Sequence, residues 1–290
     1  MELLKGAAVS AGIRQEVETL IKDLDRTPVL AIVRVGEKPD DLSYERSAVK
    51  KMEAFGLKAR SYVFDAEISD ADFKKAFVKI NEDPEVDGIL VLRPLPKQIR
   101  ETDIERMIDP AKDVDGISPV SLAGVFAGDE TGFAPCTAEA VVEMLKAYGI
   151  PIAGRRAVVV GRSMVVGRPL AMLLLKENAT VTICHTKTED LPAVCRQAQI
   201  LAAAAGRPRM LGRDHVGKGA AVLDVGINVD PDGNLCGDVD LAAIEDIAAA
   251  ATPVPGGIGA VTTAVLARHT ALAAGRRKKA AKGWPFSVNF

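Results

Sequence analysis

The sequence predicts an α/β fold with two domains, and three observations lead to this prediction. Short apolar runs rich in β-branched residues alternate with segments of helical periodicity, which is typical of parallel sheets covered by helices. A strand–helix–strand order occurs in the first half of the chain and again in the second. The 290 residues, of which 48% are hydrophobic, are enough to build two cores.

The first half predicts a βαβαβ unit. Its expected elements are a helix over 8–25, a strand over 28–35, a helix over 41–55 capped by Gly56, a strand over 58–64, a helix over 70–82 and a strand over 86–92. Pro94 and Pro96 must lie outside the sheet, since proline cannot donate to a central ladder. A parallel sheet with helices on its faces is therefore expected here.

The second half repeats the pattern after a helix over 137–148. Strands are expected over 157–160, 179–184, 198–204 and 220–225, with helices between them and a closing helix over 262–275. We expect one domain over 1–149, completed by the closing helix, and a second over 150–261. The tail, 276–290, is either a solvated end or a local docking segment.

Composition excludes several classes of protein. A formal net charge of −2 gives no electrostatic footprint for nucleic acid, and no apolar run approaches the ~18 residues of a membrane span. The chain does not begin like a signal peptide. Four scattered cysteines and three histidines without ligand spacing make disulfides and a metal centre unexpected. We therefore expect a cytoplasmic protein without a metal, a membrane or a nucleic-acid partner.

The stretch Ala157–Lys176 predicts an anion site. An apolar run, Val158–Val160, leads into the turn Gly161–Arg162–Ser163, and a helix with Pro169 early in it follows. Free N–H groups and the helix dipole meet at such a helix N-terminus, which is how a nucleotide pyrophosphate is usually held. The spacing differs from G-x-G-x-x-G, so an ordinary turn without a ligand is the alternative.

The next strand indicates which dinucleotide would bind. An NAD site usually has a carboxylate at this strand end, for the adenosine ribose. Here the strand ends in Cys184-His185-Thr186-Lys187-Thr, with a hydroxyl and two possible cations, and Arg162 could reach the same place. These groups favour a 2′-phosphate, so NADP is expected over NAD. The alternative is that His185 and Lys187 are solvated loop residues and Arg162 pairs with a surface carboxylate.

Several motifs together suggest a family. They are Tyr44, Lys112-Asp-Val-Asp-Gly116, Pro135-Cys-Thr137, Gly161-Arg-Ser-Met-Val-Val-Gly-Arg-Pro169, Asp224-Val-Gly-Ile-Asn228, Gly237-Asp-Val239 and Thr252-Pro-Val-Pro-Gly-Gly-Ile-Gly259. In their order and spacing the chain resembles the methylenetetrahydrofolate dehydrogenase/cyclohydrolase family over roughly residues 3–275.

The resemblance implies a catalytic domain and a Rossmann-like nucleotide-binding domain with a cleft between them, usually in a homodimer. It also implies oxidation of 5,10-methylenetetrahydrofolate to the 5,10-methenyl form by hydride transfer to a nicotinamide. Many members then hydrolyse that product to 10-formyltetrahydrofolate in the same cleft.

The resemblance also implies site residues. Tyr44 would pack on the aminobenzoyl ring of the folate, and Asp115 would pair with the pterin. The cleft loop would contribute Pro253, Pro255, Gly256 and Gly257. The cofactor contacts would be Gly161, Arg162, Ser163, Gly167, Thr186 and Ile227.

Two departures from the family pattern concern the hydrolysis. Bifunctional members have a lysine four residues after the tyrosine, where this chain has Ala48, and a glutamine where it has Leu92. Hydride transfer needs mainly proximity, whereas hydrolysis needs a group that activates water and moves protons. We therefore expect a dehydrogenase with weak or absent cyclohydrolase activity.

Three other functions stay open. A bifunctional enzyme could use Lys51, which is seven residues after Tyr44 on the same helix face, although Lys51 could equally be a solvated surface charge. A folate- or nucleotide-binding protein without turnover is the second alternative. A dehydrogenase for a small acid is the third, and the weakest, because no catalytic His/Asp or Lys/Asp pair stands out.

Overall fold

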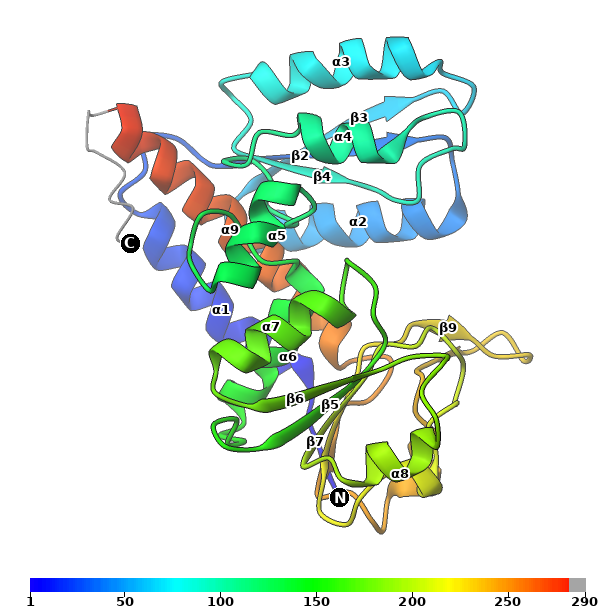
Figure 1. Cartoon of the computed structure of the whole chain (residues 1–290). Coiled ribbons are helices and arrows are strands. Elements are labelled where there is room, and N and C mark those ends of the chain that lie inside the picture. Colours follow the sequence, from blue (N-terminus) through cyan, green and yellow to red (C-terminus); the bar gives the residue numbers. More distant parts are fainter. Residues whose placement is uncertain (282–290) are drawn as a thin grey trace. The chain divides into compact units, whose positions relative to one another are not determined.

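The computed structural model describes residues 1–281, so part of the tail considered above, 282–290, lies outside the described residues. The chain forms two compact units (Figure 1). The six-stranded unit consists of Met1–Gly12 and Pro135–Thr262, and the three-stranded unit consists of Ile13–Ala134 and the chain from Thr263 onwards. Helices α1 (Gly6–Ile21) and α9 (Ile258–Ala281) each begin in the six-stranded unit and end in the other.

The three-stranded unit confirms the predicted βαβαβ order. Its elements are β2 (Val29–Val35), α2 (Pro39–Ala54), β3 (Lys58–Phe64), α3 (Asp70–Glu82), β4 (Gly88–Val91), α4 (Glu101–Met107) and α5 (Pro119–Ala127). The strands are parallel in the order β3-β2-β4. Strand β4 ends before Pro94, as the two prolines require. Helices α2 and α3 cover opposite faces of this sheet (Figure 1).

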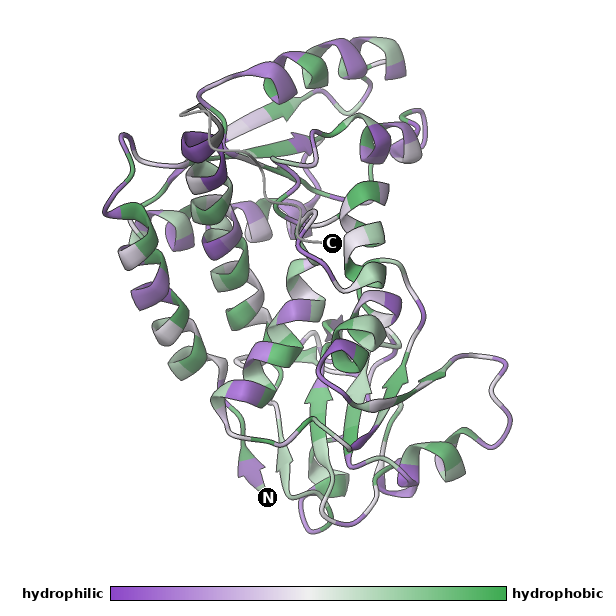
Figure 2. Ribbon diagram, turned by 60° about the vertical axis from the view of Figure 1, so that its left-hand side comes forward, coloured by the Kyte–Doolittle hydropathy of each residue, from purple (hydrophilic) through white to green (hydrophobic). Residues whose placement is uncertain are grey.

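Strand β2 is buried at all seven positions because it lies between two strands and between two helical layers. Ala31, Val33 and Val35 share a core with Phe73 and Phe77 of α3. Side chains alternate along a strand, so the even-numbered residues, Arg34 among them, face α2. The strand ribbons are mostly apolar and the helices carry their polar residues in patches (Figure 2).

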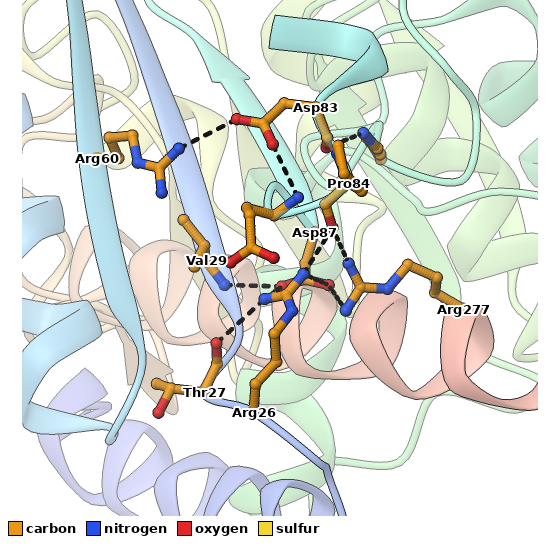
Figure 3. Close-up of polar contacts among 10 residues, drawn as sticks. Arg26, Thr27, Val29, Arg60, Asp83, Pro84, Asp87 and Arg277 are labelled. Carbon is orange, nitrogen blue, oxygen red and sulfur yellow. Dashed lines mark hydrogen bonds and ion pairs between the residues drawn. The ribbon is translucent and has the colours of Figure 1, made fainter. Parts of the chain in front are cut away.

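An ionic cluster holds the amino end of this sheet to the last turns of α9 (Figure 3). The fully buried carboxylate of Asp87 accepts from Val29 N at 2.9 Å and from Arg26 Nη1 at 2.8 Å, and lies 2.8 Å from Arg277 Nη2. Both arginines also donate to the carbonyl oxygen of Pro84. One carboxylate thus joins three segments that are far apart in the sequence.

We predict that Asp87→Ala lowers the free energy of unfolding by about 2–4 kcal/mol, because two guanidinium groups and a buried N–H lose their acceptor. Urea titration of the purified variant measures this change. Asp83→Ala is the matched control, since its partner Arg60 is exposed and the loss should stay below about 1 kcal/mol. Equal losses in the two variants would contradict the prediction.

The six-stranded unit contains the second predicted α/β pattern. Its elements, besides the parts of α1 and α9, are β1 (Glu2–Leu3), α6 (Cys136–Ala147), β5 (Arg156–Val160), α7 (Gly167–Lys176), β6 (Thr180–Cys184), α8 (Leu191–Arg196), β7 (Ile200–Ala203), β8 (Ala221–Asp224), β9 (Asn228–Val229), β10 (Leu235–Cys236) and β11 (Ala250–Ala251), with short 3-10 turns at Arg213–His215 and Ala242–Ile244. The sheet is parallel throughout, in the order β1-β11-β8-β7-β5-β6. Strands β1 and β11 and the β9–β10 hairpin could not be predicted from the sequence, because strands of two residues show no alternation of polar and apolar side chains.

By their contacts, the first 12 residues and α6 belong to the six-stranded unit, whereas sequence analysis places them in a domain over 1–149. The pairing of β1 with β11 holds the N-terminus there. Helix α6 buries seven of its twelve residues and packs against α7. Both links are tertiary, so local periodicity does not show them. Among the described residues, no helix is long and apolar enough to cross a membrane.

Candidate active site

The Gly161 turn lies at the switch point of the six-stranded sheet. Strand β6 lies on one side of β5 and β7 on the other, so the connections after these strands diverge. Ligands of open parallel sheets bind at the carboxyl ends of the strands, where the strand order reverses. Gly161 has φ +139°, and a Cβ added to it would lie 2.1 Å from the carbonyl oxygen of Ala204. The two backbones approach this closely because residue 161 has no side chain.

The same turn opens α7. Ser163 Oγ accepts from the N–H groups of Val166 at 3.1 Å and Gly167 at 3.5 Å. Gly167 also needs to be glycine, since an added Cβ would lie 2.2 Å from the carbonyl oxygen of Gly161. Arg162 and Ser163 are exposed on this turn. The turn therefore has the close backbone packing and the accessible polar groups that a bound pyrophosphate requires.

The end of β6 lies next to this turn, because Gly161 N donates to Cys184 O at 2.9 Å. Backbone N–H groups of the following segment bond within it, His185 N to Thr188 Oγ1 at 2.8 Å and Lys187 N to His185 Nδ1 at 3.1 Å. Thr186 and Lys187 are exposed. With Arg162, they are suitable donors for a phosphate group in this place.

Two loops of this edge are held by a carboxylate that sequence analysis did not select. Asp238 is fully buried and accepts from the N–H groups of Ala205 at 2.6 Å, Gly206 at 3.0 Å and Arg207 at 2.8 Å. It also accepts from Asn228 Nδ2 at 2.9 Å. The motif Gly237-Asp-Val239 is the only sequence signal for this role.

Asp224 anchors the neighbouring loop. Its carboxylate accepts from the N–H groups of Gly226 and Asp238 at 3.0 Å and of Val239 at 2.9 Å. Burial raises the pKa of Asp224 to about 6, although these three N–H groups lower it. Ile227 follows on the surface and exposes 69% of its area. The two buried aspartates thus hold the loops at the carboxyl edge of the sheet through backbone N–H groups. Ile227 lies on the surface of one of these loops.

The proline–glycine loop closes the same edge. Gly6 N donates to Gly256 O at 2.9 Å, and a Cβ on Gly6 would lie 2.3 Å from Gly257 O. Pro255 and Gly256 are exposed, whereas Gly257 is buried. The half-buried Pro253 begins the loop. Gly6 is therefore a second residue that the sequence analysis missed, and its spacing from the loop gave no local signal.

Tyr44 lies in the second turn of α2 in the three-stranded unit, with 36% of its surface exposed. Ala48, one turn further on, has no exposed surface. Lys51 is half-buried, and its Nζ lies 5.5 Å from the ring centroid of Phe55. Burial lowers the pKa of Lys51 below its usual value. The position one turn after Tyr44 is thus filled by a buried methyl group.

Asp115 lies in a loop that other residues hold in place. Asp113 is fully buried and accepts from Ile117 N at 2.9 Å and Ser118 N at 2.8 Å. The carbonyl oxygen of Val114 lies 2.8 Å from Nδ1 of the buried His269 of α9. Asp115 itself is half-buried. In the Asp-Val-Asp motif the first aspartate is structural, and the second remains accessible.

Leu92 is buried beside β2, and its N–H donates to Val33 O at 2.9 Å. The next residue, Arg93, has its Nη1 3.1 Å from Glu105 and 3.6 Å from Glu101 of α4. Both residues lie just beyond the carboxyl end of β4. Leu92 is apolar, and the guanidinium of Arg93 only donates hydrogen bonds and is paired here, so neither side chain offers a base.

The predicted site residues therefore form two groups. The dinucleotide residues and the proline–glycine loop surround the carboxyl edge of the six-stranded sheet, and Tyr44, Lys51 and Asp115 belong to the three-stranded unit. Among the described residues, no group of three or more His, Cys, Asp or Glu side chains is arranged to hold a metal ion.

The two groups coincide with two family models. Residues 4–115 match the tetrahydrofolate dehydrogenase/cyclohydrolase catalytic domain, and residues 135–278 match the NAD(P)-binding domain of the same family. The bifunctional protein FolD of Carboxydothermus hydrogenoformans is 50% identical over 274 residues, which cover 93% of this chain and 96% of that protein.

Solved structures of enzymes from the same family also match this chain. The bifunctional FolD enzyme of Campylobacter jejuni has a TM-score of 0.92 at 39% identity, over 96% of this chain and 99% of its own. The Trypanosoma brucei enzyme, solved with NADP and an inhibitor, has a TM-score of 0.88 at 33% identity, over 95% and 97%. Because both domain models of this family match, and because relatives match almost from end to end, the chain belongs to the tetrahydrofolate dehydrogenase/cyclohydrolase family.

Proposed function

We propose that this enzyme oxidises 5,10-methylenetetrahydrofolate to 5,10-methenyltetrahydrofolate with NADP as the hydride acceptor. The observation that carries the proposal is the close backbone packing of the Gly161 turn, which lies at the switch point of a domain of the NAD(P)-binding type. Exposed Arg162, Thr186 and Lys187 favour NADP, because a carboxylate at this strand end would repel a 2′-phosphate and these groups would hold one.

The chain's own task in this reaction is to bind and orient. Tyr44 would hold the aminobenzoyl ring and Asp115 the pterin, while the turn at Gly161 and the loops under Asp224 and Asp238 would hold the dinucleotide. When bound, the nicotinamide supplies the hydride acceptor. Proximity of about 3–3.5 Å between the reacting carbons accounts for most of the catalysis, and no protein base is needed.

Hydrolysis of the methenyl product makes a different demand, and we propose that it is weak or absent. Water must be activated and protons moved, which is worth about 10²–10⁴-fold in rate when a side chain of suitable pKa does it. The family resemblance implies a lysine and a glutamine for this task. This chain has Ala48, which is fully buried, and Leu92, which is buried and apolar, at those two positions. Neither can take up a proton.

A bifunctional enzyme with Lys51 as the base is the second candidate. Two observations favour it. Burial lowers the pKa of Lys51, and the relatives from Carboxydothermus hydrogenoformans and Campylobacter jejuni are named as bifunctional proteins. A base is most effective when its pKa lies near the working pH. The two candidates differ only in the fate of the methenyl product.

A two-part assay separates the candidates. Reduction of NADP and of NAD is followed with methylenetetrahydrofolate, and the absorbance of methenyltetrahydrofolate is followed separately against the buffer rate, with the Campylobacter jejuni enzyme as positive control. We expect reduction of NADP, preferred at least about tenfold over NAD in kcat/KM, without enzymic hydrolysis. Hydrolysis clearly above the buffer rate would reject the proposed loss, and its disappearance in Lys51→Ala would establish the second candidate.

We also propose that the enzyme is a homodimer, as the family resemblance implies. Sedimentation equilibrium measures the mass directly: twice the 30.7 kDa of one chain supports the proposal, and the mass of a single chain rejects it.

A further inference from the structure

A buried ion pair lies at the carboxyl end of the central strand of the three-stranded sheet. Nε of Arg34 donates to Oε2 of Glu45 at 2.6 Å, and Nη1 of Arg34 donates to the carbonyl oxygen of Gly36. Arg34 exposes 7% of its surface and Glu45 9%. Arg34 is the one charged residue in β2, and Glu45 is the one charged residue of the buried stripe of α2. The pair is thus an ionic contact in an otherwise apolar layer.

Two residues of the expected departure from the family pattern, Ala48 and Leu92, lie next to the pair. Ala48 follows Glu45 after one helical turn and is buried on the same face of α2. Leu92 N bonds to Val33 O, which continues the register of β2 and β4 and sets Leu92 beside Arg34. Parallel neighbours in register point to the same face of a sheet. The polar contact between helix and sheet is therefore made here by Arg34 and Glu45.

Stability alone gives little reason for such a pair. Removing two charges from water is costly, and well-packed apolar side chains of similar volume often stabilise a fold as much or more. A directional pair adds a single fixed geometry, which apolar contacts do not. Here it ties the second turn of α2 to the end of β2, and the bond to Gly36 holds the loop between them.

The ion pair between Arg34 and Glu45 fixes the position of Tyr44. Tyr44 directly precedes Glu45 in the same helical turn, on the more exposed side. A second bond, from Lys38 Nζ to Pro94 O at 2.6 Å, joins the start of α2 to the loop after β4. The helix carrying Tyr44 is therefore held by polar contacts at the carboxyl edge of the sheet, where ligands of parallel sheets bind.

We propose that Arg34 and Glu45 are positioning residues for the folate: the ion pair sets α2 along β2 and thereby fixes the ring of Tyr44 against the aminobenzoyl group. This inference rests on the proposed dehydrogenase function and adds to it a pair of residues that do not touch the substrate. Their loss should change folate binding without changing the binding of the dinucleotide, whose residues belong to the other unit.

The test compares KM values in Glu45→Gln. We expect the KM for methylenetetrahydrofolate to rise about tenfold or more, with the KM for NADP changed by less than about twofold. The matched control is Asp87→Asn, which weakens another buried carboxylate–arginine cluster at the opposite end of the same sheet. The control should lower the melting temperature and leave both KM values unchanged. A similar rise in folate KM in both variants would overturn the inference, since general loosening would then suffice.

Two further variants keep the test decisive. Arg34→Met combined with Glu45→Leu leaves no unpaired charge, so it should fold and still show the raised folate KM; a wild-type KM would reject the inference. In a Tyr44→Ala background, Glu45→Gln should change the folate KM by less than about twofold, because the two residues act through one contact. Fully additive effects would show that the pair does not act through Tyr44.

Failure of the proposed function gives a different result. A wild-type protein that does not reduce NADP or NAD with methylenetetrahydrofolate rejects that function, and this inference with it. An active wild type whose Glu45→Gln variant has an unchanged folate KM rejects the inference alone.

Discussion

Gly161→Ala is expected to abolish dinucleotide binding. The added methyl group would lie 2.1 Å from the carbonyl oxygen of Ala204, and φ +139° is itself strained for alanine. The loops after β5 and β7 must then separate, and the turn that opens α7 loses its shape. Titration of protein fluorescence or calorimetry with NADP should show a Kd raised at least about 100-fold, which corresponds to about 2.8 kcal/mol.

The control for this prediction is Gly212→Ala in the same unit. Gly212 has no atoms within 4 Å of an added Cβ and has φ −112°, which any residue adopts. This variant should bind NADP like the wild type. An unchanged Kd in Gly161→Ala would show that the Gly161 turn is not part of the dinucleotide site.

Asp224→Ala is expected to cost about 3 kcal/mol or more of unfolding free energy. Three N–H groups, those of Gly226, Asp238 and Val239, donate to this buried carboxylate and would lose their acceptor. Asp238 lies in the affected segment and holds the Ala205–Arg207 loop in turn. Denaturant unfolding measures the loss. Asp232→Ala, at an exposed carboxylate of the same segment, should stay within about 0.5 kcal/mol.

The loss in Asp224→Ala should also depend on pH. The pKa of Asp224 in the folded chain is about 6, above the ordinary value of 3.8, because burial disfavours the charged form. A raised pKa contributes stability that is complete below 3.8 and is lost as the pH rises through 6. The difference between wild type and variant should therefore grow by about 1.4 kcal/mol between pH 7.5 and pH 5. A difference that shrinks over this range would contradict the assignment.

The order of helices and strands could be predicted because it depends on hydrophobic periodicity over short stretches of the sequence. The β-branched run of β2, the helical period of α3 and the prolines after β4 each act over a few residues, and the observed bounds agree within a few positions. The glycine turn at Gly161 was equally visible, since its residue types have a backbone requirement of their own.

The division of the chain and the supports of the site depend on distant contacts. Gly6 meets the loop at Gly256 across 250 residues, and His269 meets Val114 across 155. Asp238 and Asp113 lie in motifs that the sequence shows, but only their burial among backbone N–H groups reveals that they shape loops. Arg34 is a charged residue in an otherwise apolar, buried strand, and the sequence offers no reason for it. The structure shows that Glu45 of α2 pairs with it.

The sequence by itself determined the two α/β patterns, the glycine turn at Gly161 and the apolar identity of Ala48 and Leu92, because each is a matter of residue identity or short-range period. Only the tertiary structure decided which carboxylates support the loops, that Ala48 is fully buried, and that an arginine–glutamate pair connects α2 to its sheet. The physical reason is that burial and ion pairing arise between segments far apart in the chain, and neither leaves a trace in local sequence.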